Sequence, residues 1–318
     1  MKKWIRNLAA IMLSLFLMAA PVCAQELLIP VGQLIGLEVK NDTLTVVEPE
    51  GGTCPAGIKP GDVLLKVNDT EVNDPEDVRS ILNRADGAVE LLLRRKEELV
   101  QVKLTPQITG DGPRLGIYLK QGITGVGTVT WYDPDTGAFG ALGHGINSPQ
   151  QTLVDMEQGT AYKAQVVAVK KGKAGEPGQL IGTISGKDSI GPLSKNAQQG
   201  VFGKAKGAFS GQELPVATKE EIKKGPATIL STVSGNTPQE YSVEIVKVYP
   251  TSAATGRNLL LKVTDPALLE TTGGIVQGMS GSPIIQDGKL IGAVTHVLVN
   301  DPTMGYGIFI ENMLSAAA

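Results

Sequence analysis

One short run of the sequence combines two serines with two glycines and a proline, and such a run could support nucleophilic catalysis. It is GMSGSP at residues 278–283, and the apolar residues after it predict a hairpin that turns at residues 287–288. A glycine-rich turn can expose a serine hydroxyl and present backbone N–H groups to an oxyanion. The alternative is an ordinary β-turn. We expect Ser280 to be the nucleophile and Ser282, which precedes the proline, to be a turn residue.

A serine nucleophile needs a base that accepts its proton, and the chain contains 2 histidines. His144 lies between two glycines in GAFGALGHGI, directly after a predicted strand. His296 lies 16 residues after Ser280, on the strand that leaves the serine turn. We expect His144 to be the base and His296 to line a substrate cleft. The alternative for His144 is a loop histidine without a role.

The base in turn needs an acid that fixes its tautomer and stabilises its cation. Asp265 is the candidate, 15 residues before Ser280 and at the end of the apolar run LLLKVTD. Because Pro266 and further helix-forming residues follow it, Asp265 could equally cap a short helix. The sequence therefore offers the order His144, Asp265, Ser280 for a catalytic triad.

Composition indicates which elements must position these residues. The 318 residues suffice for two domains, and 39 glycines, 19 prolines and 4% aromatic residues favour a β-rich, loop-rich protein. Six strands are expected in the second part of the chain, and turns at short intervals between them predict a barrel or sandwich: 126–131, 164–169, 180–184, 227–230, 241–248 and 259–263. A net charge of −3 argues against a nucleic-acid partner, and the few histidines and cysteines predict no metal site and no cofactor.

The first part of the chain resembles a PDZ domain, and the run AGIKPGDVLLKVND at residues 56–69 carries the resemblance. Asp74 is a predicted helix N-cap, and two strands follow at residues 89–94 and 99–104. We place this domain at residues 27–106, followed by a linker at 105–114. A PDZ domain adds a peptide as a strand and binds its terminal carboxylate with backbone amides. The resemblance assigns that role to the loop Gly32, Gln33, Leu34, Ile35, Gly36 and Leu37.

The first 24 residues have the pattern of a targeting segment. Basic residues precede an apolar run, and VCA at residues 22–24 offers a cleavage site. We expect residues 1–24 to be a signal peptide, or alternatively an uncleaved membrane anchor, and the protein to be exported. Cys54 would be the one cysteine left after cleavage, so no internal disulfide is expected.

Two motif runs, TGAFGALGHGI and GGIVQGMSGSPIIQDGKLIGAVTHV, together with the preceding PDZ-like region, resemble the SpoIVB (stage IV sporulation protein B) peptidase family. The serine turn is also similar to the GDSGGP turn of chymotrypsin-like proteases. These resemblances imply a chymotrypsin-like double β-barrel at residues 107–318. They imply the catalytic residues His144, Asp265 and Ser280, and an oxyanion hole formed by the N–H groups of Gly278 and Ser280.

The family resemblance also implies a biological role. Members are exported from the forespore into the space between forespore and mother cell, where they process themselves. They then cleave a regulator of a membrane-embedded metalloprotease, which leads to activation of a late mother-cell sigma factor. The expected partners are a protein substrate at a membrane complex and a peptide ligand of the PDZ domain, which could be the chain's own N-terminal region. The alternative is a scaffold of the cell envelope that binds peptides and has no catalytic activity.

Overall fold

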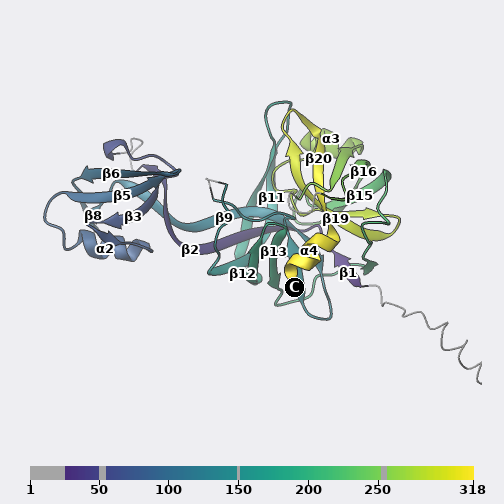
Figure 1. Ribbon diagram of the computed structural model, residues 1–318, viewed down its shortest axis with the longest axis horizontal. Helices are drawn as coiled ribbons and strands as arrows, with labels where there is room; N and C mark the ends of the chain where they lie inside the picture. The colour runs from purple at the N-terminus through teal and green to yellow at the C-terminus, as the bar shows by residue number, and fades with distance from the viewer. Residues whose placement is uncertain (1–25, 50–54, 149–150, 252–255) are drawn as a thin grey trace, which may run out of the picture.

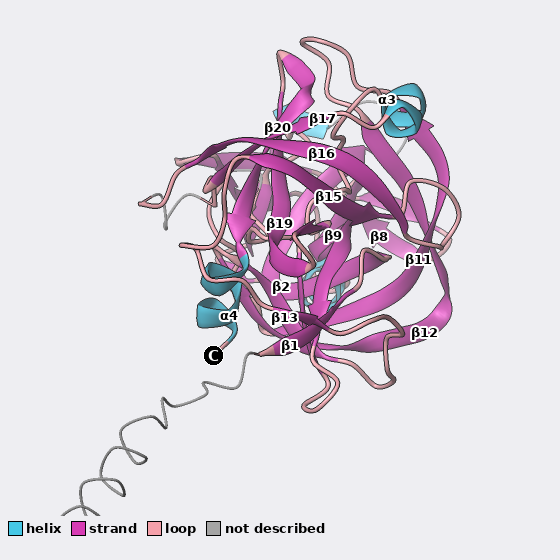
Figure 2. Cartoon of the chain, turned by 90° about the vertical axis from the view of Figure 1, so that its right-hand side faces the viewer, coloured by secondary structure: helices cyan, strands magenta, loops and turns pink. Residues whose placement is uncertain are grey.

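The computed structural model describes residues 26–49, 55–148, 151–251 and 256–318. The predicted signal peptide or anchor at residues 1–24 and Cys54 lie outside this part of the chain. Strands dominate the described residues, and they form two barrels and a smaller separate module (Figures 1 and 2). The expectation of a mainly β protein is confirmed.

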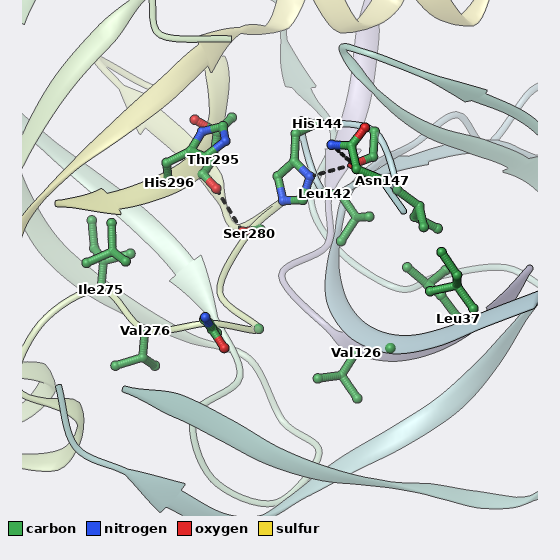
Figure 3. A pocket seen from close by; sticks show the side chains of 17 residues that line it. Leu37, Val126, Leu142, His144, Asn147, Ile275, Val276, Ser280, Thr295 and His296 are labelled. Carbon is green, nitrogen blue, oxygen red and sulfur yellow. Dashed lines mark hydrogen bonds between the residues drawn. The ribbon is translucent and has the colours of Figure 1, made fainter. Parts of the chain in front are cut away.

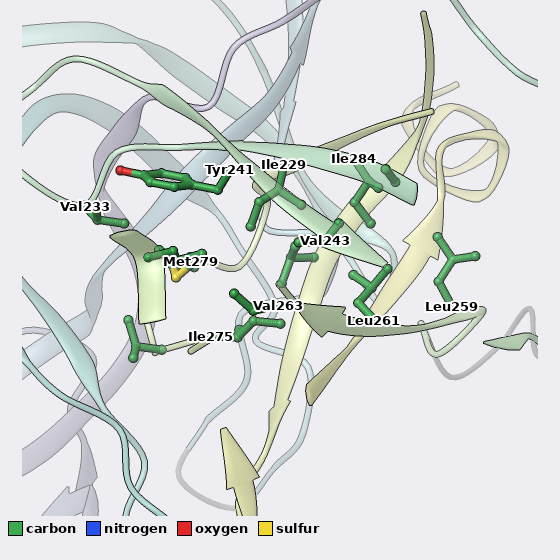
Figure 4. Close-up of a cluster of buried hydrophobic side chains, with 14 of the residues drawn as sticks. Ile229, Val233, Tyr241, Val243, Leu259, Leu261, Val263, Ile275, Met279 and Ile284 are labelled. Atoms are coloured by element: carbon green, nitrogen blue, oxygen red, sulfur yellow. The ribbon is translucent and has the colours of Figure 1, made fainter. Parts of the chain in front are cut away.

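The C-terminal third of the chain forms a closed barrel of six antiparallel strands. In barrel order these are β15 (Gly225–Ser231), β16 (Gln239–Val248), β17 (Leu259–Val263), β20 (Asp301–Phe309), β19 (Lys289–Leu298) and β18 (Pro283–Gln286). Alternating apolar residues point inward from these strands and bury a common core, part of which is drawn in Figure 4. The hairpin predicted after the serine turn is confirmed: β18 and β19 meet at Asp287 and Gly288, which both have positive φ angles, of 50° and 73°.

Six strands that precede this barrel in the chain form another ring, which we call the first barrel; the C-terminal barrel is the second barrel. In ring order its strands are β9 (Ile117–Tyr132), β10 (Ala138–Ala141), β13 (Gly200–Lys204), β12 (Gln179–Ala197), β11 (Gln158–Lys170) and β2 (Leu34–Pro49). Pairing of β2 with β9 closes the ring. The short strands β1 (Leu27–Pro30) and β14 (Leu214–Pro215) extend the sheet beyond β9. Together the two barrels form the double β-barrel that the family resemblance implied.

The PDZ domain is inserted between two strands of the first barrel, which corrects the expected domain boundary at residue 27. Residues 35–40 pair with β11, and residues 34–39 pair with residues 123–128 of β9, inside the barrel. Beyond a break in register, residues 44–49 of the same strand pair with residues 117–121 of β9 inside the PDZ domain. Both strands therefore run from one domain into the other, as Figure 1 shows.

This arrangement also corrects the predicted carboxylate-binding loop at residues 32–37. Leu34 and Ile35 are fully buried in the barrel, and Gly36 and Leu37 pair with Tyr162 and Ala161 of β11. The run GQLIGL at residues 32–37 resembles a PDZ loop because it combines glycine with aliphatic residues, and a buried barrel strand has the same composition. These residues do not contribute to a PDZ groove.

The PDZ domain itself has the predicted local structure. It contains η1 (Pro55–Gly57), β3 (Val63–Val67), β4 (Thr70–Glu71), α2 (Pro75–Leu82), β5 (Val89–Arg95) and β6 (Glu98–Leu104). Asp74 caps α2 in a capping box with Asp77, as the sequence indicated. The predicted linker at residues 105–114 instead forms a hairpin of β7 (Gln107–Thr109) and β8 (Gly112–Arg114).

Two short helices complete the peptidase part. α3 (Pro266–Thr272) begins directly after Asp265, and α4 (Ile310–Ala317) ends the chain. α4 buries Ile310 and Met313 in a cluster with Phe202 of the first barrel and Leu290 of the second. This helix therefore helps to fix the two barrels against each other. No helix within the described residues is long and apolar enough to cross a membrane.

Candidate active site

The loop that carries His144 follows β10 and makes a tight turn. Leu142 and Gly143 both have positive φ angles, of 70° and 69°. Such angles are unfavourable for leucine, and strain of this kind is concentrated at functional sites. The Leu142 side chain fits in this turn because Gly127, which faces it, has no side chain. A Cβ on Gly127 would lie 2.0 Å from the Leu142 side chain. The loop thereby presents the His144 imidazole at the boundary between the two barrels.

The turn around Ser280 is bound to β9 of the first barrel through its backbone. Thr128 donates its backbone N–H to the carbonyl of Ser280 (2.9 Å) and its hydroxyl to the carbonyl of Gly278 (2.9 Å). The hydroxyl of Thr130 donates to the carbonyl of Gly281 (2.8 Å). Both threonines are fully buried. These bonds hold the serine of one barrel against the histidine of the other, and the sequence alone did not identify them.

The two serines of the turn have different surroundings. Ser282 is fully buried and donates its hydroxyl to the hydroxyl of Ser231 (2.9 Å). Ser280 is half-buried, lines a cavity, and donates its hydroxyl to the backbone carbonyl of Thr295 (2.8 Å). Of the two hydroxyls, that of Ser280 is therefore the one that a substrate can reach.

The backbone beside Ser280 offers two N–H groups that are candidates for an oxyanion site. The N–H groups of Gly278 and Ser280 donate to no backbone carbonyl in the described part of the chain. Gly278 adopts a φ of 98°, which favours glycine, and it lines the same cavity as Ser280. Both N–H groups are thus free to bind a ligand atom.

His144 is held from its Nδ1 side. Nδ1 lies 2.9 Å from the carbonyl oxygen of Gly145, and a carbonyl can only accept, so this contact requires a proton on Nδ1. Nε2 then carries the lone pair and can act as a base. Burial lowers the pKa of His144, and the Gly145 carbonyl partly offsets this effect by favouring the protonated ring.

Asp265 is not brought to His144. One carboxylate oxygen accepts the backbone N–H groups of Ala267 (2.9 Å) and Leu268 (3.0 Å), so Asp265 caps α3. The other oxygen accepts the N–H of Ser242 (3.3 Å). Among the described residues no carboxylate bonds to His144 or lines the cavity. The helix-cap alternative is therefore the role that the structure gives to Asp265, and the expected contact with His144 is absent.

The cavity around Ser280 has a volume of about 470 Å³ and lies between the two barrels. Figure 3 shows Ser280 near both histidines, with apolar side chains on opposite walls: Ile275, Val276, Val126 and Leu37. No Asp, Glu, Lys or Arg side chain of the described residues lines it. Leu37, expected in a PDZ groove, is thus a wall residue of this cavity. His296 lines the cavity as predicted.

The described residues contain no cluster of three or more His, Cys, Asp or Glu side chains that could hold a metal ion. What the site combines is a serine hydroxyl, a neutral imidazole and two free backbone N–H groups in one cavity. This combination can carry out acyl transfer through a covalent serine intermediate.

Comparison with known proteins agrees with this chemistry. The profile of the SpoIVB peptidase S55 family matches residues 112–314. The chain belongs to this family. A PDZ domain profile matches residues 44–95, which begins where β2 enters the inserted domain. The protein is a serine endopeptidase with a PDZ domain, and both parts imply binding of peptides or proteins.

Comparison with solved structures gives more distant similarities. The active form of the Rv3671c protease from M. tuberculosis shares 13% identity over 61% of this chain and 73% of its own, with a TM-score of 0.37. The HtrA-type protease AlgW with a decapeptide shares 13% identity over 66% of this chain and 57% of its own, with a TM-score of 0.36. No protein in the curated set matches the sequence significantly.

Proposed function

We propose that the peptidase cleaves peptide bonds with Ser280 as nucleophile and His144 as general base and acid. The observation that carries this proposal is the cavity that collects Ser280, His144 and the free N–H groups of Gly278 and Ser280. Ser280 now donates its hydroxyl to Thr295, so the side chain rotates from this carbonyl to Nε2 of His144 before it attacks.

The reaction then follows from the geometry. Nε2 of His144 accepts the Ser280 proton while Oγ forms a bond to the substrate carbonyl carbon, and the N–H groups of Gly278 and Ser280 bind the oxyanion. The imidazolium gives its proton to the leaving amine, and the peptide bond breaks to leave an acyl-enzyme. A water molecule, deprotonated by His144, hydrolyses the ester and releases Ser280. Loss of a single oxyanion donor costs ~10²–10³ in rate in this type of site.

The cavity also indicates the substrate class. Its walls combine aliphatic side chains with a few uncharged polar ones, among them Asn147 and Gln277, and carry no Asp, Glu, Lys or Arg within the described residues. A charged residue next to the scissile bond would therefore be desolvated without a partner. The peptidase therefore prefers uncharged, apolar residues there.

The biological role that we propose is that of the family. The peptidase is exported, with residues 1–24 as its signal or anchor, and acts between forespore and mother cell in sporulation signalling. It processes itself and cleaves a regulator of a membrane-embedded metalloprotease, which leads to activation of a late sigma factor. Its PDZ domain binds a peptide and controls proteolysis. Membership of the SpoIVB peptidase family supports this role.

The first test is labelling of the purified full-length chain with a fluorophosphonate probe. We expect labelling to be lost in Ser280→Ala and strongly slowed in His144→Ala. Ser282→Ala is the matched control, because Ser282 lies in the same turn but is bonded to Ser231 away from the cavity. It should label like the wild type. Labelling that survives in Ser280→Ala would show that the nucleophile lies elsewhere.

A further inference from the structure

The two histidines of the chain, 152 positions apart, meet in one cavity. The rings of His144 and His296 have centroids 5.3 Å apart and are inclined by 37° (Figure 3). His144 comes from a loop of the first barrel and His296 from β19 of the second. The sequence indicated His296 as a cleft residue, but it did not indicate a contact with the catalytic imidazole.

An irregularity in β19 accompanies this contact. Val294 pairs with Gly307 and His296 pairs with Tyr306, so Thr295 is an extra residue without a partner in β20. A bulge of this kind redirects side chains and is often found beside active sites. Here the carbonyl of Thr295 accepts the Ser280 hydroxyl (2.8 Å), and the next residue, His296, enters the cavity. One bulge thus places groups beside both Ser280 and His144.

The His296 side chain carries an unused polar atom. Its Nδ1 is buried and has no hydrogen-bond partner in the described structure. Burial, followed by the nearby His144 and Arg257, lowers the pKa of His296 to about 4. His296 is therefore neutral at pH 7, and it adds no second positive charge when His144 becomes an imidazolium during catalysis.

Few other groups in the described part of the chain can orient His144 or stabilise its imidazolium form. The Gly145 carbonyl occupies the Nδ1 side of His144, and the carboxylate of Asp265 is bound to α3. The charged or titratable groups that face His296 in the described residues are His144, Arg257 and Tyr306, with the guanidinium of Arg257 5.2 Å from the Tyr306 ring centroid. None of these is a carboxylate. His296 is the side chain whose ring contacts the base directly.

We propose that His296 is the positioning residue for His144, in the role that the sequence suggested for Asp265. Its neutral ring confines the His144 imidazole from one side while the Gly145 carbonyl holds Nδ1 from the other. It also shields the base from water. This inference rests on the proposed role of Ser280 and His144, and it adds a third residue to their reaction.

The test measures the rate constant of fluorophosphonate labelling from pH 4 to 9 for the full-length wild type, His296→Ala and His296→Gln. We expect His296→Ala to label about 10²-fold more slowly, since loss of orientation at a catalytic group has effects of this size. Removal of the ring exposes His144 to water, so the midpoint of the acidic limb should move to higher pH. His296→Gln keeps an acceptor and much of the volume, and it should recover part of the rate.

Two comparisons make the outcome specific. Hydrolysis of a p-nitrophenyl ester of an apolar acylated amino acid separates kcat from KM, and we expect the loss in His296→Ala to lie in kcat. Thermal melts of both variants identify loss of folding. A wild-type labelling rate and pH midpoint in His296→Ala, or a change confined to KM, would overturn the positioning role. Labelling that persists in Ser280→Ala would instead refute the proposed function itself.

Discussion

Asp265→Asn separates a catalytic aspartate from a helix-capping one. If Asp265 oriented His144, the amide would favour the wrong tautomer, and kcat would fall by ~10⁴ as it does in a Ser-His-Asp triad. In the structure its carboxylate caps α3 and accepts the N–H groups of Ala267 and Leu268. Asparagine and aspartate are about equally good N-caps, so the structure predicts that kcat changes by less than about threefold.

The companion variant Asp265→Ala measures how much the helix cap contributes to the free energy of unfolding. It removes the acceptor of two helix N–H groups and should lower the free energy of unfolding by about 0.5–2 kcal/mol. Ester hydrolysis and urea denaturation measure the two effects separately. Asp74→Asn is the matched control, because Asp74 caps α2 in the PDZ domain in the same manner. A loss of several orders of magnitude in Asp265→Asn, with an unchanged unfolding midpoint, would refute our placement of this residue.

Three further predictions concern the domain junction and pH. Gly122→Ala should destabilise the protein strongly, because Gly122 has a φ of 73° and an added Cβ would lie 2.0 Å from the carbonyl oxygen of Val39. Urea denaturation measures the loss of stability. Gly57→Ala is the matched control, because Gly57 has a φ of 78° but open space around it. The acidic limb of kcat/KM should lie below pH 6.5, because burial lowers the pKa of His144 and the base must be neutral. Since both histidines have lowered pKa values, the unfolded chain binds more protons and stability should fall as pH drops below about 6.5. A midpoint above pH 7, or stability that rises on acidification from pH 6.5 to 5, would contradict this reasoning.

The elements of the fold were accessible from the sequence because their signals are local. The strand alternation, the turn at residues 287–288 and the Asp74 cap each depend on neighbouring residues, and the structure contains all three. The pairing of Ser280 and His144 in one cavity was also predicted, since few residues could serve as base. These inferences required only the residue types and the short distances between them in the sequence.

The errors arose where the role of a residue depends on distant strands. Asp265 has the local environment of an N-cap, and its distance from His144 is fixed by the packing of two barrels. Likewise, residues 32–37 carry a glycine and aliphatic pattern that suits either a PDZ loop or a buried strand, and their pairing with residues 161–163 decides between them. No sequence pattern indicated the role of Thr128, because its hydroxyl bonds to the carbonyl of Gly278, which is 150 residues away in the chain.

The insertion of the PDZ domain has a consequence for the order of folding. Pairing of Val39 with Ile123 closes a loop of 83 residues (40–122), which in an unfolded chain costs about 4 kcal/mol of entropy. Once the PDZ domain has folded and Leu44 is paired with Gln121, the loop consists of residues 40–43 and 122. The entropy cost of the Val39–Ile123 pairing then falls to about 1.4 kcal/mol. On this reasoning, folding of the inserted domain would bring β2 and β9 of the first barrel together before they pair there, and a chain with a defective PDZ domain should assemble that barrel late.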